Sequence, residues 1–286
     1  MIALTFCTDL WFKSFHDFKA GEFCMKEIAE FAVSLARDAG ALLVEKFTGE
    51  NRVFYKGTID LVTEADKMSE DLILTQISRR YPGHGILSEE SDARNERAAA
   101  RWIIDPLDGT TNYAHGFPFF CVSIAFEQDG IMEAGVIYDP LRDELFQATR
   151  GGGAFLNGRR IHVSAVDELS RALLATGFPY DIRVSRQNNL DYFNRMAINA
   201  QAVRRPGAAA LDLAYLAAGR IDGFWELKLK PWDTAAGSLL VREGGGVISD
   251  LQGEAWNLYS TGIVASNRLI HEQMMEVIKK VGNEMR

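Results

Sequence analysis

The stretch Trp102-Ile103-Ile104-Asp105-Pro106-Leu107-Asp108-Gly109-Thr110-Thr111-Asn112 compresses a strand, a turn and the start of a helix into one short segment. The run Trp-Ile-Ile is typical of a buried strand, and Pro106 ends that strand because proline has no backbone N–H to donate. Asp105 and Asp108 flank the turn, so both carboxylates can face one cation. Carboxylate oxygens are the ligands that Mg²⁺ prefers in proteins.

The residues after the second aspartate add a site for an anion. Gly109 followed by Thr110, Thr111 and Asn112 predicts a loop that opens a helix. Free backbone N–H groups and the helix dipole attract negative charge at such a place. A metal site beside a phosphate site favours phosphate-ester chemistry. The alternative is structural: a strand and turn with solvated acids, followed by a helix start rich in Thr and Asn.

The composition favours a folded protein and argues against several classes of function. The chain has 286 residues, of which 47% are hydrophobic, enough for one large domain or two modest ones. The net charge of −8, without a lysine and arginine cluster, argues against a nucleic-acid surface. No apolar run approaches the roughly 18–20 residues that span a bilayer. Three scattered cysteines without zinc-site spacing favour a reduced, cytoplasmic compartment.

Residues 1–24 differ from the rest of the chain. They mix charged and aromatic side chains, and they contain neither the apolar core nor the small-residue cleavage site of a signal peptide. From Met25 onward, apolar residues recur at helical spacing, which predicts a helix over 25–48. Met25 is therefore a candidate start, and residues 1–24 are interpreted as an N-terminal extension that need not be native.

The remaining chain divides into two patterns at about residue 165. A helix is expected over 66–80, and short apolar runs at 85–88, 101–105, 122–127, 135–138, 144–149 and 153–156 predict one largely antiparallel sheet. Strands near 172–176, 223–226, 247–250 and 262–266 then alternate with helices near 186–199, 208–219, 233–244 and 268–281. Since no linker separates them, an α+β half (25–165) and an α/β half (166–286) should form a single catalytic unit over 25–286.

Three further segments carry acids where a metal site can be completed. Glu89 follows a predicted strand, Asp66 ends the run Asp-Leu-Val-Thr-Glu-Ala-Asp, and Asp233 begins a predicted helix. Each has a structural alternative. Glu89 and its neighbour Glu90 are consistent with surface charge, Asp66 with a capping box, and Asp233 with a helix N-cap.

Together these four segments, in this order, make the chain resemble the inositol monophosphatase family of Mg²⁺-dependent, lithium-sensitive phosphatases. The resemblance rests on WIIDPLDGTTNYAHGFPFF at 102–120, PWDTAAGSLLVREGGGVISD at 231–250, DLVTEAD at 60–66 and GILSEES at 85–91, and it covers roughly 25–286. It implies an α/β (α+β) fold, the layered α-β-α-β-α sandwich of the inositol monophosphatase and fructose-1,6-bisphosphatase type. It also implies a homodimer.

The resemblance further implies which residues bind metal. Glu89, Asp105 and the carbonyl of Leu107 would bind a first Mg²⁺. Asp105, Asp108 and Asp233 would bind a second, and a third, weaker ion near Glu89 gives two to three ions per subunit. Adjacent cations of this kind clamp a phosphate and stabilise its leaving oxygen.

The implied catalytic residues are Asp66, Thr110 and Glu89. A metal-bound water would be the nucleophile, oriented and deprotonated by Thr110 hydrogen-bonded to Asp66, with Glu89 assisting. The implied substrate contacts are Asp108, Gly109, Thr110, Gly207, Ala208, Ala209, Glu226 and Asp233. Among them, the N–H groups of Gly109 and Thr110 would hold the phosphate, and Glu226 would accept hydrogen bonds from substrate hydroxyls. Ala208 stands where many members of the family carry Ser or Thr, so one hydroxyl contact is lost.

These features predict a Mg²⁺-dependent phosphomonoesterase that hydrolyses inositol 1-phosphate or a similar polyol or sugar phosphate. One alternative is a related phosphatase acting on fructose 1,6-bisphosphate, histidinol phosphate or a 3′-phosphoadenosine nucleotide. Another is a non-catalytic regulatory or scaffold protein that reuses the fold. The expected partners are small molecules, without nucleic acid or membrane.

Overall fold

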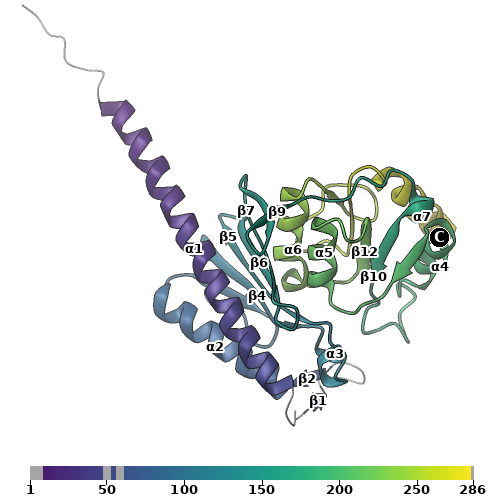
Figure 1. Cartoon of the computed structure of the whole chain (residues 1–286), viewed down its shortest axis with the longest axis horizontal. Helices are drawn as coiled ribbons and strands as arrows, with labels where there is room; N and C mark the ends of the chain where they lie inside the picture. The colour runs from purple at the N-terminus through teal and green to yellow at the C-terminus, as the bar shows by residue number, and fades with distance from the viewer. Residues whose placement is uncertain (1–8, 48–52, 56–60, 285–286) are drawn as a thin grey trace, which may run out of the picture.

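The computed structural model describes residues 9–47, 53–55 and 61–284, and two β-sheets organise them (Figure 1). The first sheet orders its seven strands as β3 (Gly85–Ser88), β4 (Ala100–Asp108), β5 (Cys121–Gln128), β6 (Ile131–Asp139), β7 (Glu144–Thr149), β8 (Gly153–Leu156) and β9 (Arg159–Ile161). Strands β3 and β4 run parallel, and every later neighbour pairs antiparallel. The expected largely antiparallel sheet is confirmed. Strand β9 was not predicted, because two of its three residues are exposed arginines.

The second sheet has five strands in the order β11 (Ala202–Arg204), β10 (Leu173–Thr176), β12 (Gly223–Leu227), β14 (Gly262–Ser266) and β13 (Val247–Ser249). Strand β10 pairs parallel with β11 and β12, whereas β14 pairs antiparallel with β12 and β13. The sequence did not predict β11, nor the hairpin of β1 (Val53–Tyr55) and β2 (Leu61–Thr63). All three are only three residues long, which is too short to show a period-two pattern.

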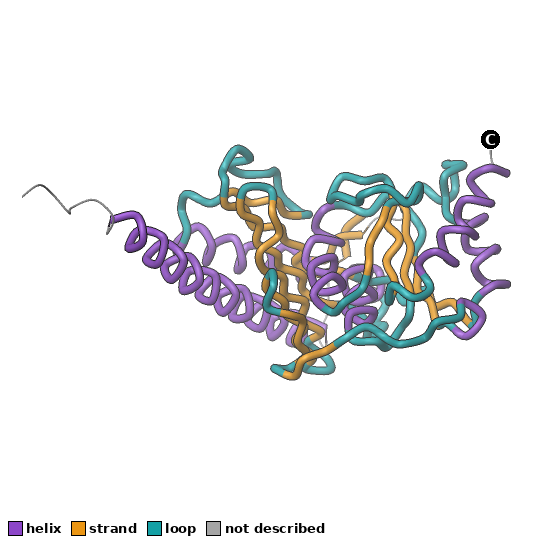
Figure 2. Tube along the Cα trace, turned by 90° about the horizontal axis from the view of Figure 1, so that it is seen from above, coloured by secondary structure: helices purple, strands orange, loops and turns teal. Residues whose placement is uncertain are grey.

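Helices fill three layers around these sheets. Helices α1 (Asp9–Phe47) and α2 (Glu64–Arg80) cover one face of the first sheet, and α5 (Ala209–Ala217) and α6 (Pro231–Glu243) lie between the sheets. Helices α4 (Leu190–Asn199) and α7 (His271–Glu284) cover the far face of the second sheet. Figures 1 and 2 show this order of layers. The α-β-α-β-α sandwich expected from the sequence is therefore confirmed.

Helix α1 begins at Asp9, so the predicted helix start at Met25 is wrong. No proline interrupts residues 9–24, and the helix simply continues through the predicted start. Within residues 25–47 of α1, the first buried side chain is that of Ile28, one turn after Met25. In Figures 1 and 2 the N-terminal part of α1 runs out beyond the sheets. Residues 1–8 and residue 48 lie outside the described residues.

None of the helices in the described part of the chain is both long enough and apolar enough to cross a membrane.

Candidate active site

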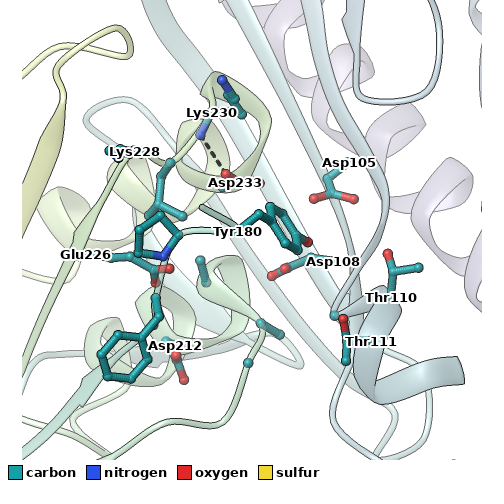
Figure 3. Close-up of a pocket in the computed structure, with 18 of the residues that line it drawn as sticks. Asp105, Asp108, Thr110, Thr111, Tyr180, Asp212, Glu226, Lys228, Lys230 and Asp233 are labelled. Atoms are coloured by element: carbon teal, nitrogen blue, oxygen red, sulfur yellow. Dashed lines mark hydrogen bonds between the residues drawn. The ribbon is translucent and has the colours of Figure 1, made fainter. Parts of the chain in front are cut away.

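A pocket of about 340 Å³ opens where the end of β4 faces the end of β12 and the start of α6. Most of the residues that the sequence predicts for a site line this pocket: Glu89, Asp105, Leu107, Asp108, Gly109, Thr110, Gly207, Ala208, Ala209, Glu226 and Asp233. Figure 3 shows Asp105, Asp108 and Thr110 on one side, with Asp233 and Glu226 opposite them. Asp66 does not line the pocket and lies behind Thr110, to which it is hydrogen-bonded.

A β-bulge in β4 turns Asp105 and Asp108 to the same face. In a regular strand, residues three apart point to opposite faces. Here Asp105 pairs with Ser123 and Asp108 with Cys121, so β4 holds one residue more than β5 between the two pairs. Leu107 consequently packs toward α1 and α2, while both carboxylates face the pocket. The N–H of Leu107 donates to Asp105 Oδ1 across the turn, at 3.0 Å.

Gly109 makes the tight passage from β4 into α3 (Thr110–Ala114). Its φ of 95° lies in the left-handed region that favours glycine. A Cβ at this position would also meet the carbonyl oxygen of Phe119 at 2.9 Å. The chain therefore needs glycine here to turn sharply enough to bring Thr110 beside Asp108. The predicted loop that opens a helix is confirmed.

Asp66 forms the capping box that the sequence offered as an alternative, and it also contacts Thr110. One carboxylate oxygen accepts the backbone N–H of Thr63 at 2.8 Å and completes a capping box at the start of α2. The other accepts the Thr110 hydroxyl at 3.0 Å. That hydroxyl also lies 3.0 Å from the carbonyl of Leu107, and its one proton can be donated to only one of the two at a time. Burial is the main cause that raises the pKa of Asp66.

The segment that carries Glu89 is held in place by Glu70 on α2. One carboxylate oxygen of Glu70 accepts hydrogen bonds from the Ser88 hydroxyl, the Glu90 N–H and the Ser91 hydroxyl. The side chain of Glu70 is buried. Glu89 therefore enters the pocket from a segment that is tied down on both sides.

Asp108 and Asp233 are fixed by backbone donors from helix starts. Asp108 Oδ2 accepts the N–H of Ala210 in the first turn of α5, at 2.7 Å. Asp233 Oδ2 accepts the N–H of Lys230 just before α6, at 2.6 Å. The first bond connects β4 to α5, and the second fixes Asp233 at the start of α6. The suggested N-cap role of Asp233 is wrong, because α6 starts earlier and its N-cap is Lys230; Asp233 stands at the third helical position, and its second oxygen makes no hydrogen bond with a described residue.

The pocket concentrates negative charge away from water. Burial is the largest cause that raises the pKa of Asp105 well above its ordinary value, and the charges of Glu89, Asp108 and Asp233 raise it further. Burial likewise raises the pKa of Asp108 and of Asp233 to about 7. For Asp233, the charge of Asp108 adds to the rise, and the nearby Lys230 opposes it. Four carboxylates that line one pocket and repel one another are destabilising unless a positive charge joins them.

The donor set fits a divalent cation that prefers oxygen ligands. Asp105 and Asp233 each use one carboxylate oxygen for a backbone N–H and keep the other without a hydrogen bond to a described residue. Within residues 9–47, 53–55 and 61–284, no three His, Cys, Asp or Glu side chains already converge as a preformed metal site. Cation binding would therefore draw the side chains of Glu89, Asp105, Asp108 and Asp233 closer together.

The far end of the pocket contains groups that sequence reasoning did not find. Asp212 on α5 lines it beside Glu226, and Tyr180, from the loop after β10, reaches across the middle of the pocket toward Asp108 (Figure 3). The one available signal for Asp212 was a lone acid within the apolar run Ala-Ala-Leu-Asp-Leu-Ala-Tyr-Leu-Ala-Ala. Lys228 does not pair with Glu226 and instead donates to Asp181 at 2.7 Å.

Comparisons with known proteins agree with this geometry. A sequence profile described as the inositol monophosphatase family matches residues 25–283. A protein of Mesorhizobium japonicum named inositol-1-monophosphatase is 45% identical, over 86% of this chain and 91% of the relative. A protein of Escherichia coli K12 named Nus factor SuhB is 43% identical, over 88% and 95% of the two chains.

A solved structure of inositol monophosphatase from Anabaena superposes with a TM-score of 0.82 at 41% identity, covering 89% of this chain and 96% of the other. The family profile begins at residue 25 and covers the fold and the pocket described above. The chain belongs to the inositol monophosphatase family.

Proposed function

We propose that the chain is a Mg²⁺-dependent phosphomonoesterase that hydrolyses inositol 1-phosphate or a similar polyol monophosphate. The observation that carries this proposal is the grouping of Asp105, Asp108, Asp233 and Glu89 in one pocket beside the Thr110–Asp66 hydrogen bond. Bound Mg²⁺ would supply charge neutralisation for the phosphate and activation of a water molecule. Glu89, Asp105, the Leu107 carbonyl, Asp108 and Asp233 would hold two to three such ions.

The proposal also assigns roles to the other residues that line the pocket. Thr110 would orient the attacking water through its hydroxyl, whose proton Asp66 accepts, with Glu89 assisting. The N–H groups of Gly109 and Thr110, at the turn into α3, would donate to phosphate oxygens as developing charge accumulates there. Glu226, with Gly207, Ala208 and Ala209 beside it, would contact the alcohol that leaves.

Phosphate release with and without Mg²⁺ tests the proposal directly. Hydrolysis should require the cation, and Asp105→Asn should lower kcat/KM by at least about a hundredfold, because one shared ligand is lost. The variant should remain folded, since Asn keeps the shape of the side chain and removes a buried charge. Wild-type turnover by Asp105→Asn at saturating Mg²⁺ would contradict the proposed metal site.

Lithium sensitivity and a homodimer are further parts of the proposal, and both rest on membership of the family. The relatives named Nus factor SuhB support a second candidate function, that of a regulatory protein with the same fold. A chain that releases no phosphate from any ester at saturating Mg²⁺ would favour that second function.

A further inference from the structure

Two carboxylates at the end of the pocket away from β4 have no part in holding the fold together. Asp212, in the first turn of α5, is 2% exposed, and Glu226, on β12, is 8% exposed. Both line the pocket. Neither side chain makes a hydrogen bond or a salt bridge with any residue in the described part of the chain. Buried carboxylates are ordinarily hydrogen-bonded, so two free ones side by side need another explanation.

The free oxygens of these carboxylates open into the pocket. Among the described residues, no fully enclosed side-chain oxygen or nitrogen lacks a partner. The unbonded oxygens of Asp212 and Glu226 must therefore keep some access to the cavity. Gly177, at the end of β10, makes room for this arrangement, because a Cβ there would overlap the Glu226 carboxylate. The chain thus provides space for a charged group that makes no bond within the protein.

The surrounding charge indicates which kind of ligand would satisfy them. Arg205 lies at the rim, and its positive charge opposes the rise in pKa that burial imposes on Asp212 and on Glu226. A cationic ligand would be repelled by Arg205 as well as attracted by the acids. An uncharged alcohol with several hydroxyls gains two hydrogen-bond acceptors and meets no such repulsion.

We propose that Asp212 joins Glu226 in a two-carboxylate subsite, which binds the leaving alcohol of the substrate at two separate hydroxyl groups. This inference rests on the proposed function and narrows it to phosphate esters of uncharged polyols. Asp212 does not touch the phosphate or the attacking water. It determines which alcohol the pocket accepts.

The test compares two esters in one variant. For Asp212→Asn, kcat/KM is measured for inositol 1-phosphate and for 4-nitrophenyl phosphate, whose leaving group has no hydroxyls to bind. The ratio of the two values should fall about tenfold to a hundredfold, the effect of losing a charge-assisted hydrogen bond. Glu226→Gln should lower the same ratio. Asp191→Asn is the matched control, because Asp191 is an exposed aspartate in the first turn of α4 and should leave the ratio unchanged.

Each other outcome has a definite meaning. Equal losses for both esters in Asp212→Asn would show a structural role, and an unchanged ratio would show that Asp212 makes no substrate contact; either result overturns the inference. A wild-type preference for a phosphate ester of an amino alcohol, lost in Asp212→Asn, would overturn it in favour of cation recognition. Failure of the wild-type chain to hydrolyse either ester would instead overturn the proposed function itself.

Discussion

Thr110 is the residue at which the fold and the proposed chemistry meet most closely. Its hydroxyl lies 3.0 Å from an oxygen of Asp66 and 3.0 Å from the carbonyl of Leu107. A cation bound to that carbonyl would compete for it as an acceptor and leave Asp66 to receive the proton. The acceptor of the Thr110 hydroxyl proton would then depend on whether a cation is bound in the pocket.

Two substitutions of Thr110 distinguish the contribution of its branched shape from that of its hydroxyl. Thr110→Val keeps the branched shape and should lower kcat about a hundredfold or more, because no group remains to orient the water. Thr110→Ser keeps the hydroxyl and should stay within about tenfold of the wild type. Measuring kcat and KM for inositol 1-phosphate, with melting temperatures as the folding control, distinguishes the two. Equal activities for the Val and Ser variants would remove the hydroxyl from the mechanism.

At the scale of elements, helix α2 is the scaffold of the site although it contributes no residue to the pocket lining. Asp66 receives the Thr110 hydroxyl, Ser69 donates to the carbonyl of Pro106 at 2.8 Å, and Glu70 holds the segment 88–91. These side chains lie within two turns of one helix face. A single rigid element thus positions the three segments that carry Thr110, Asp105 and Glu89.

Removing one of these contacts should weaken cation binding. Glu70→Ala leaves the segment 88–91 without its shared acceptor, so hydrogen exchange there should become faster. The Mg²⁺ concentration that gives half of the thermal shift should rise about tenfold, as is usual when a group supporting a metal ligand is lost. Asp71→Asn, on the exposed side of α2, serves as the control. Unchanged hydrogen exchange and unchanged Mg²⁺ affinity in Glu70→Ala would show that the segment 88–91 keeps its conformation without Glu70.

The N-terminal part of α1 should be dispensable for the catalytic fold. Within residues 25–47, the buried side chains of α1 run from Ile28 to Leu43, and a chain that starts at Met25 keeps all of these. Such a chain should match the full chain in melting temperature and in kcat. A clear loss of melting temperature in the shortened chain would show that residues 1–24 pack against the body.

The contrast between α1 and β4 shows what the sequence could predict and why. Pro106 and Gly109 mark the end of β4. Their conformational preferences depend on the residue itself and not on tertiary contacts, so the strand, the turn and the helix start were predictable. The start of α1 was not predictable in the same way. The apolar spacing used for the prediction begins at Met25, and no proline between residues 9 and 24 marks a helix boundary. Asp212 was missed for a further reason. Its role depends on the approach of α5 to β12, which no local pattern encodes.

At the scale of the whole molecule, the pocket lies between two layers of the sandwich, and each layer contributes an acid that repels the other. Asp108 belongs to β4 of the first sheet, while Asp233 lies on α6 between the sheets. Their ordinary pKa is near 4 in an unfolded chain, and burial raises both to about 7 in the folded protein. The folded state therefore binds these protons more tightly than the unfolded state does.

The sign of the pH dependence follows from this difference. In EDTA, these two groups should make the unfolding free energy fall as pH rises from about 4 to about 7, by at least about 1 kcal/mol. Asp108→Asn removes one titrating group, so its stability should decline less over the same range. Urea unfolding of both proteins at several pH values measures the difference. A steeper decline in Asp108→Asn than in the wild type would contradict the assignment.

The extra residue in β4 makes the site depend on chain length as well as on side-chain chemistry. Removing Leu107 would restore one-to-one pairing with β5 and leave Asp105 and Asp108 two residues apart, on the same face of the strand. Every carboxylate would still be present in such a chain, but the Leu107 N–H that donates to Asp105 and the Leu107 carbonyl beside Thr110 would be lost. A side-chain substitution at Leu107 keeps both backbone groups, whereas a one-codon deletion removes them together.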